Sequence, residues 1–443
     1  MWTAAELCLA CALIWVLLWA AASATSVPDV GHEDGSYDGA GAEPTGSKPQ
    51  SKLWFNDGLW WADMFDGVSR TWHIFRLDRA GVAWSDTGVQ IDDRPAARAD
   101  ALWDGRHLYV ATNVPPPQTP EGMETVTANE PARLFRYSYD AGAHRYVPDA
   151  GFPIEINQAF SETLTLDKDS RGVLWASWTQ GQTVYVNSSD GSDSVWGTPF
   201  VPDVRGATGL SPDDLSSIAA FGGSRIGLMW SDQFTSTFSF AVHRDGDPRT
   251  RWTVRVALSQ PGMADDHISL KQLEGDGQGH LFAAVKTSMD HSGRGTAPQT
   301  LLLSLDVDTG AWSSTVYGTV ADCHTRPMIV IDRVARVVHM FATAPSSPGC
   351  PHAGTPGTIY EKTTSLDRPV FAPGRGTPVV RDVASADMND VTGTKQNVTP
   401  ATGLVILAGD DATHRYWHAD IPLVAPTPTP TPATDGAVRP GAG

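Results

Sequence analysis

Short apolar and β-branched runs, separated by Gly, Asp and Asn, fill the chain between residues 51 and 422. No apolar spacing of three or four residues persists long enough to predict an amphipathic helix. Runs of this length with turn residues at both ends are typical of strands in antiparallel sheets. The pattern therefore predicts an all-β fold.

One type of apolar run recurs seven times. Its central residues are Trp60, Leu108, Leu174, Leu228, Leu281, Val338 and Val405, spaced 48 to 67 residues apart. This period fits one four-stranded sheet per repeat, with loops of variable length. Such repeats bury their faces against their neighbours, so the pattern predicts a seven-bladed β-propeller over residues 51–422. Six blades is the alternative, if the first or last unit is only partial.

A further strand precedes each run and is expected to be the innermost strand of its blade. The seven are residues 52–56, 100–103, 162–166, 214–219, 267–273, 326–331 and 394–398. Little chain follows residue 421 to form an outer strand of the last blade. The ring is therefore expected to close with an incomplete blade or with a strand borrowed from the N-terminal leader.

An aspartate ends a strand after each run. The seven are Asp78, Asp140, Asp190, Asp245, Asp306, Asp367 and Asp420. An Asp at a strand end accepts hydrogen bonds from backbone N–H groups two residues later. Because these aspartates recur at one phase of the repeat, they are predicted to cap turns and not to catalyse a reaction.

Both ends of the chain differ from the repeats. Residues 7–22 are an apolar run followed by Ala-Ser-Ala, which predicts a cleaved signal peptide over residues 1–24 and a secreted or cell-surface protein. Glu6 is the only charge before the run, so an uncleaved anchor is the alternative. Residues 25–50 are rich in Gly, Asp, Ser and Pro and predict a flexible, disordered leader. Residues 423–443 form a Pro/Thr-rich tail, in which Pro and Thr alternate over residues 426–432, and this alternation predicts an extended spacer.

Charge and cysteine content narrow the partners and the compartment. The chain has 32 Lys and Arg against 50 Asp and Glu, which argues against nucleic-acid binding. The mature chain is expected to have no membrane span and to be a monomer. Removal of residues 1–24 leaves only Cys323 and Cys350, which are predicted to form a disulfide within one repeat.

Three turns resemble the Asp-box S-x-D-x-G-x-x-W of sialidase-like, BNR-repeat propellers from secreted bacterial proteins. Residues 138–142 (SYDAG) keep its first half, residues 188–191 (SSDG) have the Gly one place early, and residues 308–312 (DTGAW) keep D-x-G-x-W. The resemblance spans roughly residues 51–421 and implies a propeller that binds or cleaves glycans. The Arg-Ile-Pro segment of sialidases is absent, so it implies the architecture more than sialidase activity.

Polar residues gather near the starts of the predicted innermost strands, which line the channel of a propeller and meet at one mouth. Candidates for substrate binding are Arg98, Asp100, Lys271, Arg326, Lys395 and Gln396, and candidates for catalysis are Glu162, Asp214, His267 and His324. A buried ring of this kind must be hydrated, internally paired or filled by a ligand. A channel of paired charges that fixes the register of the blades is an equal alternative to a ligand site.

Hydrolysis of a glycan is the first chemistry that these residues suit. It needs two carboxyl groups about a glycosidic bond, and Glu162 or Asp214 could supply one of them. Elimination is the second chemistry, in which His267 or His324 abstracts a proton beside a uronic carboxylate. Arg98, Arg326 or Lys271 would neutralise that carboxylate.

The predicted function is therefore an extracellular glycan-active propeller, either a glycoside hydrolase or a polysaccharide lyase, whose partner is a glycan or polysaccharide. A non-catalytic carbohydrate-binding or adhesion propeller is the alternative. No cofactor is expected, although Asp265, Asp266 and His267 with Asp213 and Asp214 offer ligands that could hold calcium. The 16 Trp residues are expected to pack between blades rather than to stack on sugars.

Overall fold

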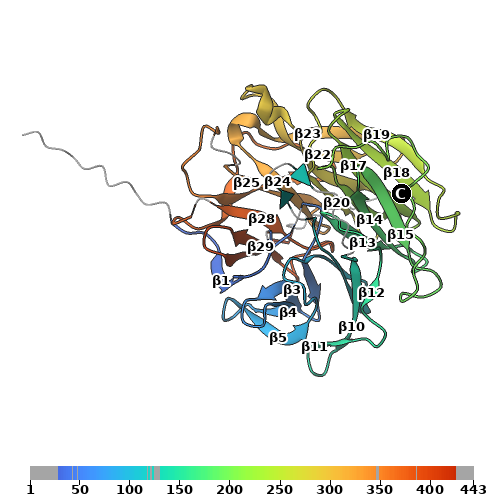
Figure 1. Cartoon of the computed structure of the whole chain (residues 1–443). Helices are drawn as coiled ribbons and strands as arrows, with labels where there is room; N and C mark the ends of the chain where they lie inside the picture. Colours follow the sequence, from blue (N-terminus) through green and yellow to red (C-terminus); the bar gives the residue numbers. More distant parts are fainter. Residues whose placement is uncertain are drawn as a thin grey trace, which may run out of the picture.

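The computed structural model describes residues 28–41, 43–46, 48–116, 118–119, 122–123, 130–345, 349–385 and 387–425. The predicted signal peptide and most of the predicted Pro/Thr tail lie outside these residues. The described chain forms a seven-bladed β-propeller, and its helical segments are two short 3-10 turns, Met289–Ser292 and Val320–Asp322 (Figure 1). The predicted fold and blade number are confirmed. Among these described residues, no helix has the length and apolar character of a membrane span.

Six blades are continuous in sequence. Blade 1 contains β2 (Leu53–Asn56), β3 (Leu59–Asp66), β4 (Thr71–Asp78) and β5 (Ala83–Gln90). Blade 2 contains β6 (Arg98–Trp103), β7 (His107–Asn113), β10 (Arg133–Asp140) and β11 (Arg145–Pro148), and β12 (Ile154–Glu155) also pairs with β10. Between β7 and β10, β8 (Gln118–Thr119) and β9 (Gly122–Met123) form a separate ribbon. Blade 3 contains β13 (Leu164–Lys168), β14 (Leu174–Gln180) and β15 (Thr183–Ser188).

The next three blades have four strands each. Blade 4 contains β16 (Ser216–Phe221), β17 (Arg225–Asp232), β18 (Thr237–Arg244) and β19 (Thr253–Ser259). Blade 5 contains β20 (Ile268–Gln272), β21 (Leu281–Lys286), β22 (Pro298–Leu305) and β23 (Trp312–Thr319). Blade 6 contains β24 (Thr325–Asp332), β25 (Val337–Ala344), β26 (Thr358–Ser365) and β27 (Thr377–Arg381).

Blade 7 closes the ring with a strand from the N-terminal leader. Its strands β28 (Met388–Thr392), β29 (Leu404–Asp410) and β30 (Arg415–Ile421) are completed at the outer edge by β1 (His32–Ser36), which pairs antiparallel with β30 (Figure 1). The borrowed-strand closure is therefore the one observed. The prediction of a disordered leader over residues 25–50 is wrong for this segment, because an edge strand gains its order from backbone pairing and needs few apolar side chains.

After β1 the chain enters the mouth of the central channel. We call residues 43–46 and 48–51 the strap. Thr45 Oγ1 donates a hydrogen bond to the Asp390 carbonyl oxygen at 2.7 Å, and Gln50 Nε2 donates to Asn113 Oδ1 at 2.9 Å. The Ser51 backbone N–H donates to Asp100 Oδ1 at 2.9 Å. The strap therefore contacts blades 2 and 7 from within the ring.

The first strand of each blade lies innermost, and β6, β13, β16, β20, β24 and β28 contact one another in succession around the channel, with β2 beside β6. Six of the predicted innermost strands agree with this order. The seventh, residues 394–398, is wrong, because these residues connect β28 to β29 and Thr394 bridges to Leu53. The polar pair Asn389-Asp390 within β28 masks that strand in the apolar pattern.

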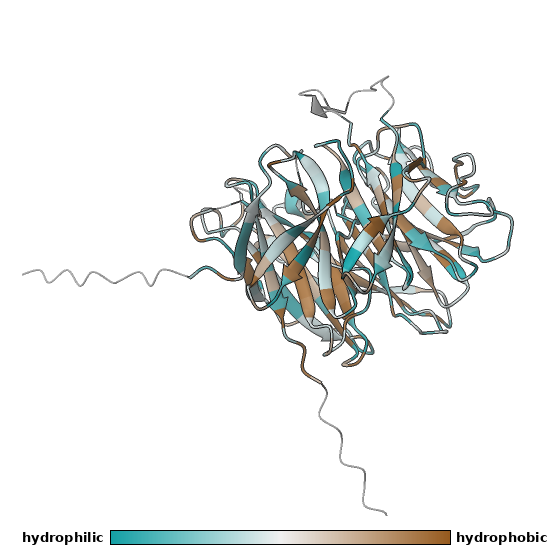
Figure 2. Ribbon diagram, turned by 90° about the horizontal axis from the view of Figure 1, so that it is seen from below, coloured by the Kyte–Doolittle hydropathy of each residue, from teal (hydrophilic) through white to brown (hydrophobic). Residues whose placement is uncertain are grey.

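The hydrophobic core lies between the blades, with apolar residues along the strands and polar residues in the rim loops (Figure 2). The largest fully buried side chains include Trp54, Trp60, Trp61, Trp72, Trp178 and Trp230. These indoles pack the blades together, as expected from their strand positions.

Three of the seven repeated aspartates cap the turn that follows them. Asp78, Asp140 and Asp306 each accept a hydrogen bond at 3.0 Å from the backbone N–H two residues later. The other four contact more distant residues: Asp245 accepts from Ser170, and Asp190, Asp367 and Asp420 pair with Arg249, Arg336 and Arg79. The equivalence of the aspartates is therefore partial.

The predicted disulfide joins Cys323, which directly precedes β24, to Cys350, in the loop between β25 and β26. The two Cα atoms are 5.8 Å apart, within the range that a disulfide can span. The bond ties the entry of an innermost strand to a loop of the same blade, as predicted.

Candidate functional site

The starts of the innermost strands meet at one end of the channel, which we call the entry mouth. Its charged side chains come from five blades and are Arg98, Glu162, Asp213, Asp266 and Arg326. Arg98 and Arg326 lie in β6 and β24, whereas the three carboxylates lie two or three residues before β13, β16 and β20. The propeller thus gathers residues that are far apart in the sequence.

Irregular strand starts direct two of the mouth residues inward. The pairing of β24 with β25 shifts register between Thr325 and Met328. The pairing of β28 with β29 shifts register between Asn389 and Thr392. Arg326 and Asp390 lie within these irregularities with φ of 50° and 48°. Bulges re-aim side chains next to functional sites. Pro327 is the sequence signal for the first of them, because proline cannot donate to a ladder.

Backbone strain is concentrated here. Of the 13 non-glycine residues with positive φ in the described chain, four belong to this network: Glu43 at 62°, Lys48 at 53°, Arg326 and Asp390. The left-handed region is unfavourable for such residues, and it persists where the surrounding contacts impose it. Two of the four lie in the strap and two in the blades that it meets.

The cationic half of the entry mouth holds a carboxylate of the strap. Glu43 forms ion pairs with Arg98 and with Arg326, whose Nη2 lies 3.3 Å from Glu43 Oε1. Arg326 also pairs with the buried Asp390, and Arg98 Nη1 donates to the Glu162 carbonyl oxygen at 2.9 Å. Although burial opposes its charged form, the two arginines and Lys48 hold the pKa of Glu43 below its ordinary value.

The anionic half holds an ammonium group of the strap. Lys48 Nζ lies 2.9 Å from Glu162 Oε1 and also pairs with Asp266. Burial disfavours the charged amine, but Asp266, Glu162 and Asp213 together raise the pKa of Lys48 above its ordinary value. The strap therefore supplies one anion to the arginines and one cation to the carboxylates.

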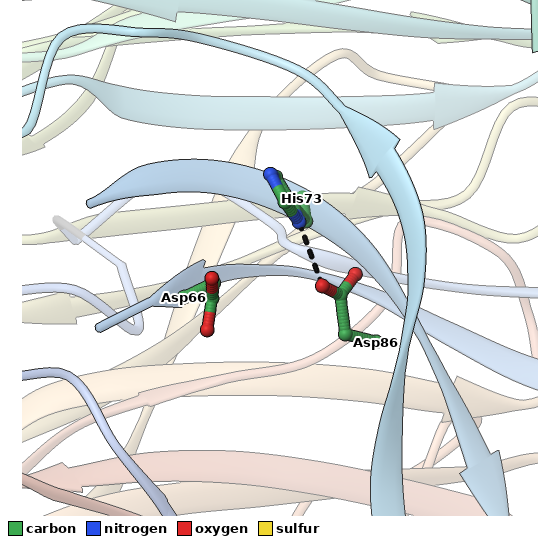
Figure 3. A group of neighbouring side chains, drawn as sticks. All are labelled: Asp66, His73 and Asp86. Atoms are coloured by element: carbon green, nitrogen blue, oxygen red, sulfur yellow. Dashed lines mark hydrogen bonds and ion pairs between the residues drawn. The ribbon is translucent and has the colours of Figure 1, made fainter. Parts of the chain in front are cut away.

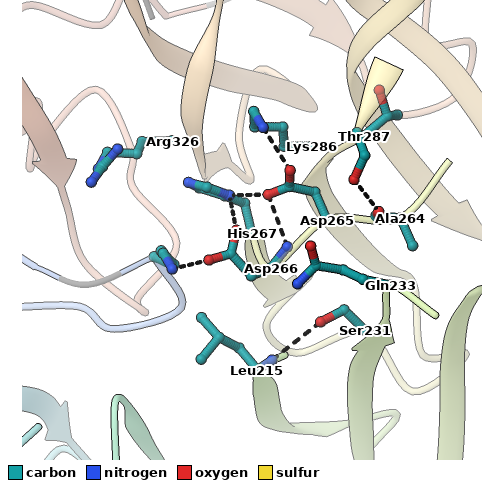
Figure 4. A network of polar contacts seen from close by, with 12 residues as sticks. Leu215, Ser231, Gln233, Ala264, Asp265, Asp266, His267, Lys286, Thr287 and Arg326 are labelled. Carbon is teal, nitrogen blue, oxygen red and sulfur yellow. Dashed lines mark hydrogen bonds and ion pairs between the residues drawn. The ribbon is translucent and has the colours of Figure 1, made fainter. Parts of the chain in front are cut away.

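His267 holds the Asp266 carboxylate in place. Its Nδ1 lies 2.7 Å from Asp265 Oδ1 and 2.6 Å from Asp266 Oδ1, and Lys286 Nζ lies 2.6 Å from Asp265 Oδ2 (Figure 4). Burial opposes protonation of the ring, yet Asp266 and Asp265 raise the pKa of His267. Its Nε2 is buried and has no hydrogen-bond partner among the described residues. We assign His267 a positioning role.

Two neighbouring carboxyl groups at the mouth have opposite pKa shifts. Carboxylate oxygens of Glu162, Asp213 and Asp266 all lie within 4.8 Å of one another. Partial burial and the charge of Asp266 raise the pKa of Asp213 to about 7. Against the effect of burial, His267 and Lys48 hold the pKa of Asp266 well below its ordinary value. One group that keeps its proton beside one that loses it is the arrangement of an acid and base pair.

A pocket of about 350 Å³ opens beside the strap. Its lining includes Tyr37, Glu43, Arg326, Asn389, Asp411 and His414. The volume is within the range of small-molecule sites in proteins, about 300–1,000 Å³. The pocket leads from solvent to Arg326 between the strap and blade 7.

Two of the predicted catalytic residues do not reach the entry mouth. Asp214 accepts hydrogen bonds from the backbone of Ser211 at 2.7 Å and of Gln233 at 3.2 Å, so its carboxylate holds a loop. His324 lies between blades 5 and 6, where its Nε2 is 3.0 Å from the Arg375 carbonyl oxygen and its ring contacts Tyr317 of β23. Burial and Lys362 lower the pKa of His324 to about 3, so it stays neutral. The prediction from the repeat pattern that both side chains face the channel mouth is therefore wrong.

Four of the predicted binding residues lie deeper in the channel or at its far end. Asp100 accepts hydrogen bonds from the Leu166 N–H at 2.7 Å and from Lys395, and Lys271 Nζ donates to Ser51 Oγ at 2.6 Å. Burial and Lys395 lower the pKa of Lys271 to about 7. Gln396 and the two lysines line a narrow cavity of about 60 Å³ at the far end, too small for a sugar residue. These groups fix the innermost strands to one another.

A separate group, Asp66, His73 and Asp86, lies in blade 1 (Figure 3). His73 Nδ1 is 2.8 Å from Asp86 Oδ2, and its Nε2 is 2.9 Å from Thr71 Oγ1. Asp66 accepts hydrogen bonds from the turn that follows β3. These polar atoms are used in local structure. At the entry mouth, Lys48 and Lys286 already neutralise Asp266 and Asp265, so this donor set does not favour calcium.

The sequence-based predictions missed the two strap residues and gave Asp213 no catalytic role. Glu43 and Lys48 stand in a stretch that is otherwise Gly, Pro, Thr and Ser, and such isolated charges were the available signal. The composition of the leader concealed it, because a segment without apolar residues is ordinarily disordered.

No family model matches the sequence, and no curated protein matches it. Several solved structures are similar at low identity. They include the polysaccharide lyase Uly1 (10% identity, TM-score 0.44, 85% of this chain and 90% of that chain). They also include hydrazine synthase of Kuenenia stuttgartiensis (10%, 0.48, 89% and 96%) and the α-L-arabinofuranosidase Arb93A of Fusarium graminearum (9%, 0.42, 77% and 99%). Similarity at this level assigns no activity, so function rests on the site.

Proposed function

We propose that the protein is an extracellular glycoside hydrolase that acts on a carboxylated glycan at the entry mouth. One observation carries the proposal: two arginines that bind the same carboxylate, Arg98 and Arg326, lie at the same mouth as two carboxyl groups with opposite pKa shifts, Asp213 and Asp266. An arginine pair suits a sugar carboxylate, because guanidinium groups bind carboxylates through charge-assisted hydrogen bonds. The disulfide between Cys323 and Cys350 supports an oxidising compartment.

In the proposed reaction, the substrate carboxylate takes the place of the Glu43 carboxylate on Arg98 and Arg326. Asp213 donates its proton to the glycosidic oxygen, the C–O bond breaks, and the leaving sugar departs as an alcohol. The Asp266 carboxylate attacks the anomeric carbon and forms a glycosyl ester. Water then attacks the same carbon, Asp213 takes the proton of that water, and Asp266 is released.

The spacing of the carboxyl groups indicates the stereochemical outcome. Retaining enzymes hold the two groups about 5–5.5 Å apart, and inverting enzymes hold them about 6.5–9.5 Å apart. One carboxylate oxygen of Asp213 lies within 4.8 Å of one of Asp266, which is closer than the separation in inverting enzymes, so we expect retention of anomeric configuration. Glu162, beside both, would stabilise the positive charge that develops on the sugar.

The test is product analysis after incubation of the full chain with neutral and carboxylated oligosaccharides. New reducing ends from carboxylated substrates only, and loss of at least about 100-fold in rate for Asp213→Asn, are expected. Asp308→Asn is the matched control, because Asp308 is exposed in the β22–β23 turn, remote from the mouth. Unsaturated uronate products would show that the enzyme cleaves by elimination and would refute hydrolysis.

A binding propeller without catalysis is the second candidate. It is favoured by one observation, that the charges of the entry mouth are paired within the protein. Binding of carboxylated glycans without any product, in wild type and control alike, would establish it and refute hydrolysis.

A further inference from the structure

The strap places a matched pair of charges in the proposed glycan site. Glu43 fills the position between Arg98 and Arg326, and Lys48 fills the position between Glu162 and Asp266. The strap carboxylate stands where the substrate carboxylate would bind. The ammonium stands where the anomeric carbon gains positive charge in an oxocarbenium-like transition state.

We propose that the strap is a displaceable, built-in occupant of the entry mouth, which competes with the acidic glycan and keeps the site closed until it leaves. The inference rests on the proposed function for the identity of the ligand. The part of the inference that concerns the strap as an occupant depends only on the contacts of Glu43 and Lys48.

The backbone of the strap supports displacement. Glu43 and Lys48 both have left-handed backbone conformations, with φ of 62° and 53°, which non-glycine residues avoid unless their contacts impose them. Release of the strap relaxes both residues. Outside its own turn, most hydrogen bonds that hold the described strap residues use a side chain: those of Thr45 and Gln50, and the bond from the Ser51 N–H to Asp100. The backbone-to-backbone exception lies at the end of the strap, where the Ala101 N–H donates to the Ser51 carbonyl oxygen at 2.7 Å.

Release would leave the ring of blades intact. The closing strand β1 pairs with β30 through residues 32–36, upstream of the strap. The Gly41 N–H donates to the Pro95 carbonyl oxygen at 2.9 Å, between β1 and the strap. The strap can therefore leave the mouth as a loop while blade 7 stays closed. The pocket beside Arg326 is where a glycan could first reach the ion pairs.

Loss of the strap unbalances the mouth in a way that a ligand can correct. Without Glu43, both guanidinium groups lose the strap carboxylate, while Arg326 keeps its ion pair with Asp390 and Arg98 keeps its hydrogen bond to the Glu162 carbonyl oxygen. Without Lys48, the carboxylates of Glu162, Asp213 and Asp266 repel one another. The first change raises affinity for a carboxylate, and the second favours protonation of Asp213, the group that must donate a proton.

The experiment compares the full-length wild type with the double variant Glu43→Ala/Lys48→Ala and with the milder Lys48→Gln. Glu33→Ala is the matched control, since it removes a leader carboxylate that pairs with Arg415 on the surface of blade 7. Hydrogen exchange of residues 43–51 and binding of oligogalacturonate and oligoglucuronate, with cellotriose as the neutral probe, are measured for each.

We expect rapid exchange of the strap in the double variant while the blades stay protected. We also expect the apparent Kd for acidic oligosaccharides to fall by about tenfold in the double variant. In wild type only the molecules whose strap has left the mouth can bind, and this small fraction weakens the apparent affinity. Glu33→Ala should match wild type. Strap exchange that occurs only with global unfolding in every variant would overturn the inference, as would equal affinity in wild type and double variant. An opened strap with no binding of any acidic probe would refute the proposed function and leave the displaceable occupant standing.

Discussion

The pair formed by Lys52 and Asp63 gives a sharp test of how charge is accommodated inside blade 1. Lys52 Nζ lies 3.1 Å from Asp63 Oδ2 and 4.2 Å from the ring centroid of Trp72. Both side chains are almost completely buried, with exposed fractions of 0% and 1%. Replacement of Lys52 by Met removes the cation and leaves a buried carboxylate without its partner.

Breaking such a buried pair from one side destabilises a protein by about 3–5 kcal/mol. We therefore expect Lys52→Met to lower the free energy of unfolding by that amount at pH 7.5. The double variant Lys52→Met/Asp63→Leu should recover most of the loss, because it removes the uncompensated charge as well. Urea unfolding of wild type, both single variants and the double variant gives the coupling energy.

The loss should also depend on pH. Burial raises the pKa of Asp63 above its ordinary value, and loss of Lys52 raises it further. A carboxyl group with a raised folded-state pKa stabilises the fold at low pH and loses this contribution as the pH rises through that pKa. Lys52→Met should therefore be less destabilising at pH 4 than at pH 7.5. An equal loss at both values, or no recovery in the double variant, would refute this reasoning.

Two further variants test other parts of the structure. Cys323 and Cys350 are 27 residues apart, and loss of a disulfide that closes a loop of this length should lower the free energy of unfolding by about 3.5 kcal/mol in Cys323→Ala/Cys350→Ala. A change below about 1 kcal/mol in denaturant unfolding would contradict this expectation. Asp100→Asn weakens a carboxylate that accepts from Ser51, Leu166 and Lys395, so we expect a loss of about 2–3 kcal/mol in thermal or urea unfolding without loss of glycan turnover. Lost turnover in a folded Asp100→Asn protein would show that the deep channel residues take part in the reaction.

The blades were predictable because their signal is local and repeated. Apolar runs centred on residues such as Trp60 and Leu281 recur at similar intervals, with turn residues on both sides. Few folds other than a propeller accommodate so many short strands with buried faces at such a repeat. The missed innermost strand β28 shows the limit of this signal, because Asn389 and Asp390 interrupt its apolar pattern. The closing strand β1 carries almost no pattern at all, since its order comes from pairing with β30.

The candidate site was only half predictable, for a geometric reason. Arg98, Glu162, His267 and Arg326 were placed near one mouth by the repeat phase, and the structure brings all four there. Phase alone cannot distinguish a side chain that faces the channel from one that packs between two blades, which is why the predicted position of His324 at the mouth is wrong. Nor can it show that the leader returns to the channel, because the contacts of Glu43 and Lys48 are with residues more than 50 positions away.

The pH dependence of hydrolysis decides whether Asp213 is the acid and Asp266 the nucleophile of the proposed reaction. A chromogenic aryl glycoside of a carboxylated sugar would be assayed from pH 4 to pH 9 with wild type, the double strap variant and Asp213→Asn. Asp213 must hold its proton and Asp266 must lose its own, and their pKa shifts place these transitions at about 7 and well below the ordinary carboxyl value. For wild type we expect a rate that is level through the acidic range and falls as the pH rises above about 7. The fall should move to higher pH in the double strap variant, because Lys48 lowers the pKa of Asp213, and it should be absent from the residual rate of Asp213→Asn. A rate that rises with pH through 7, or an unchanged profile in Asp213→Asn, would contradict it.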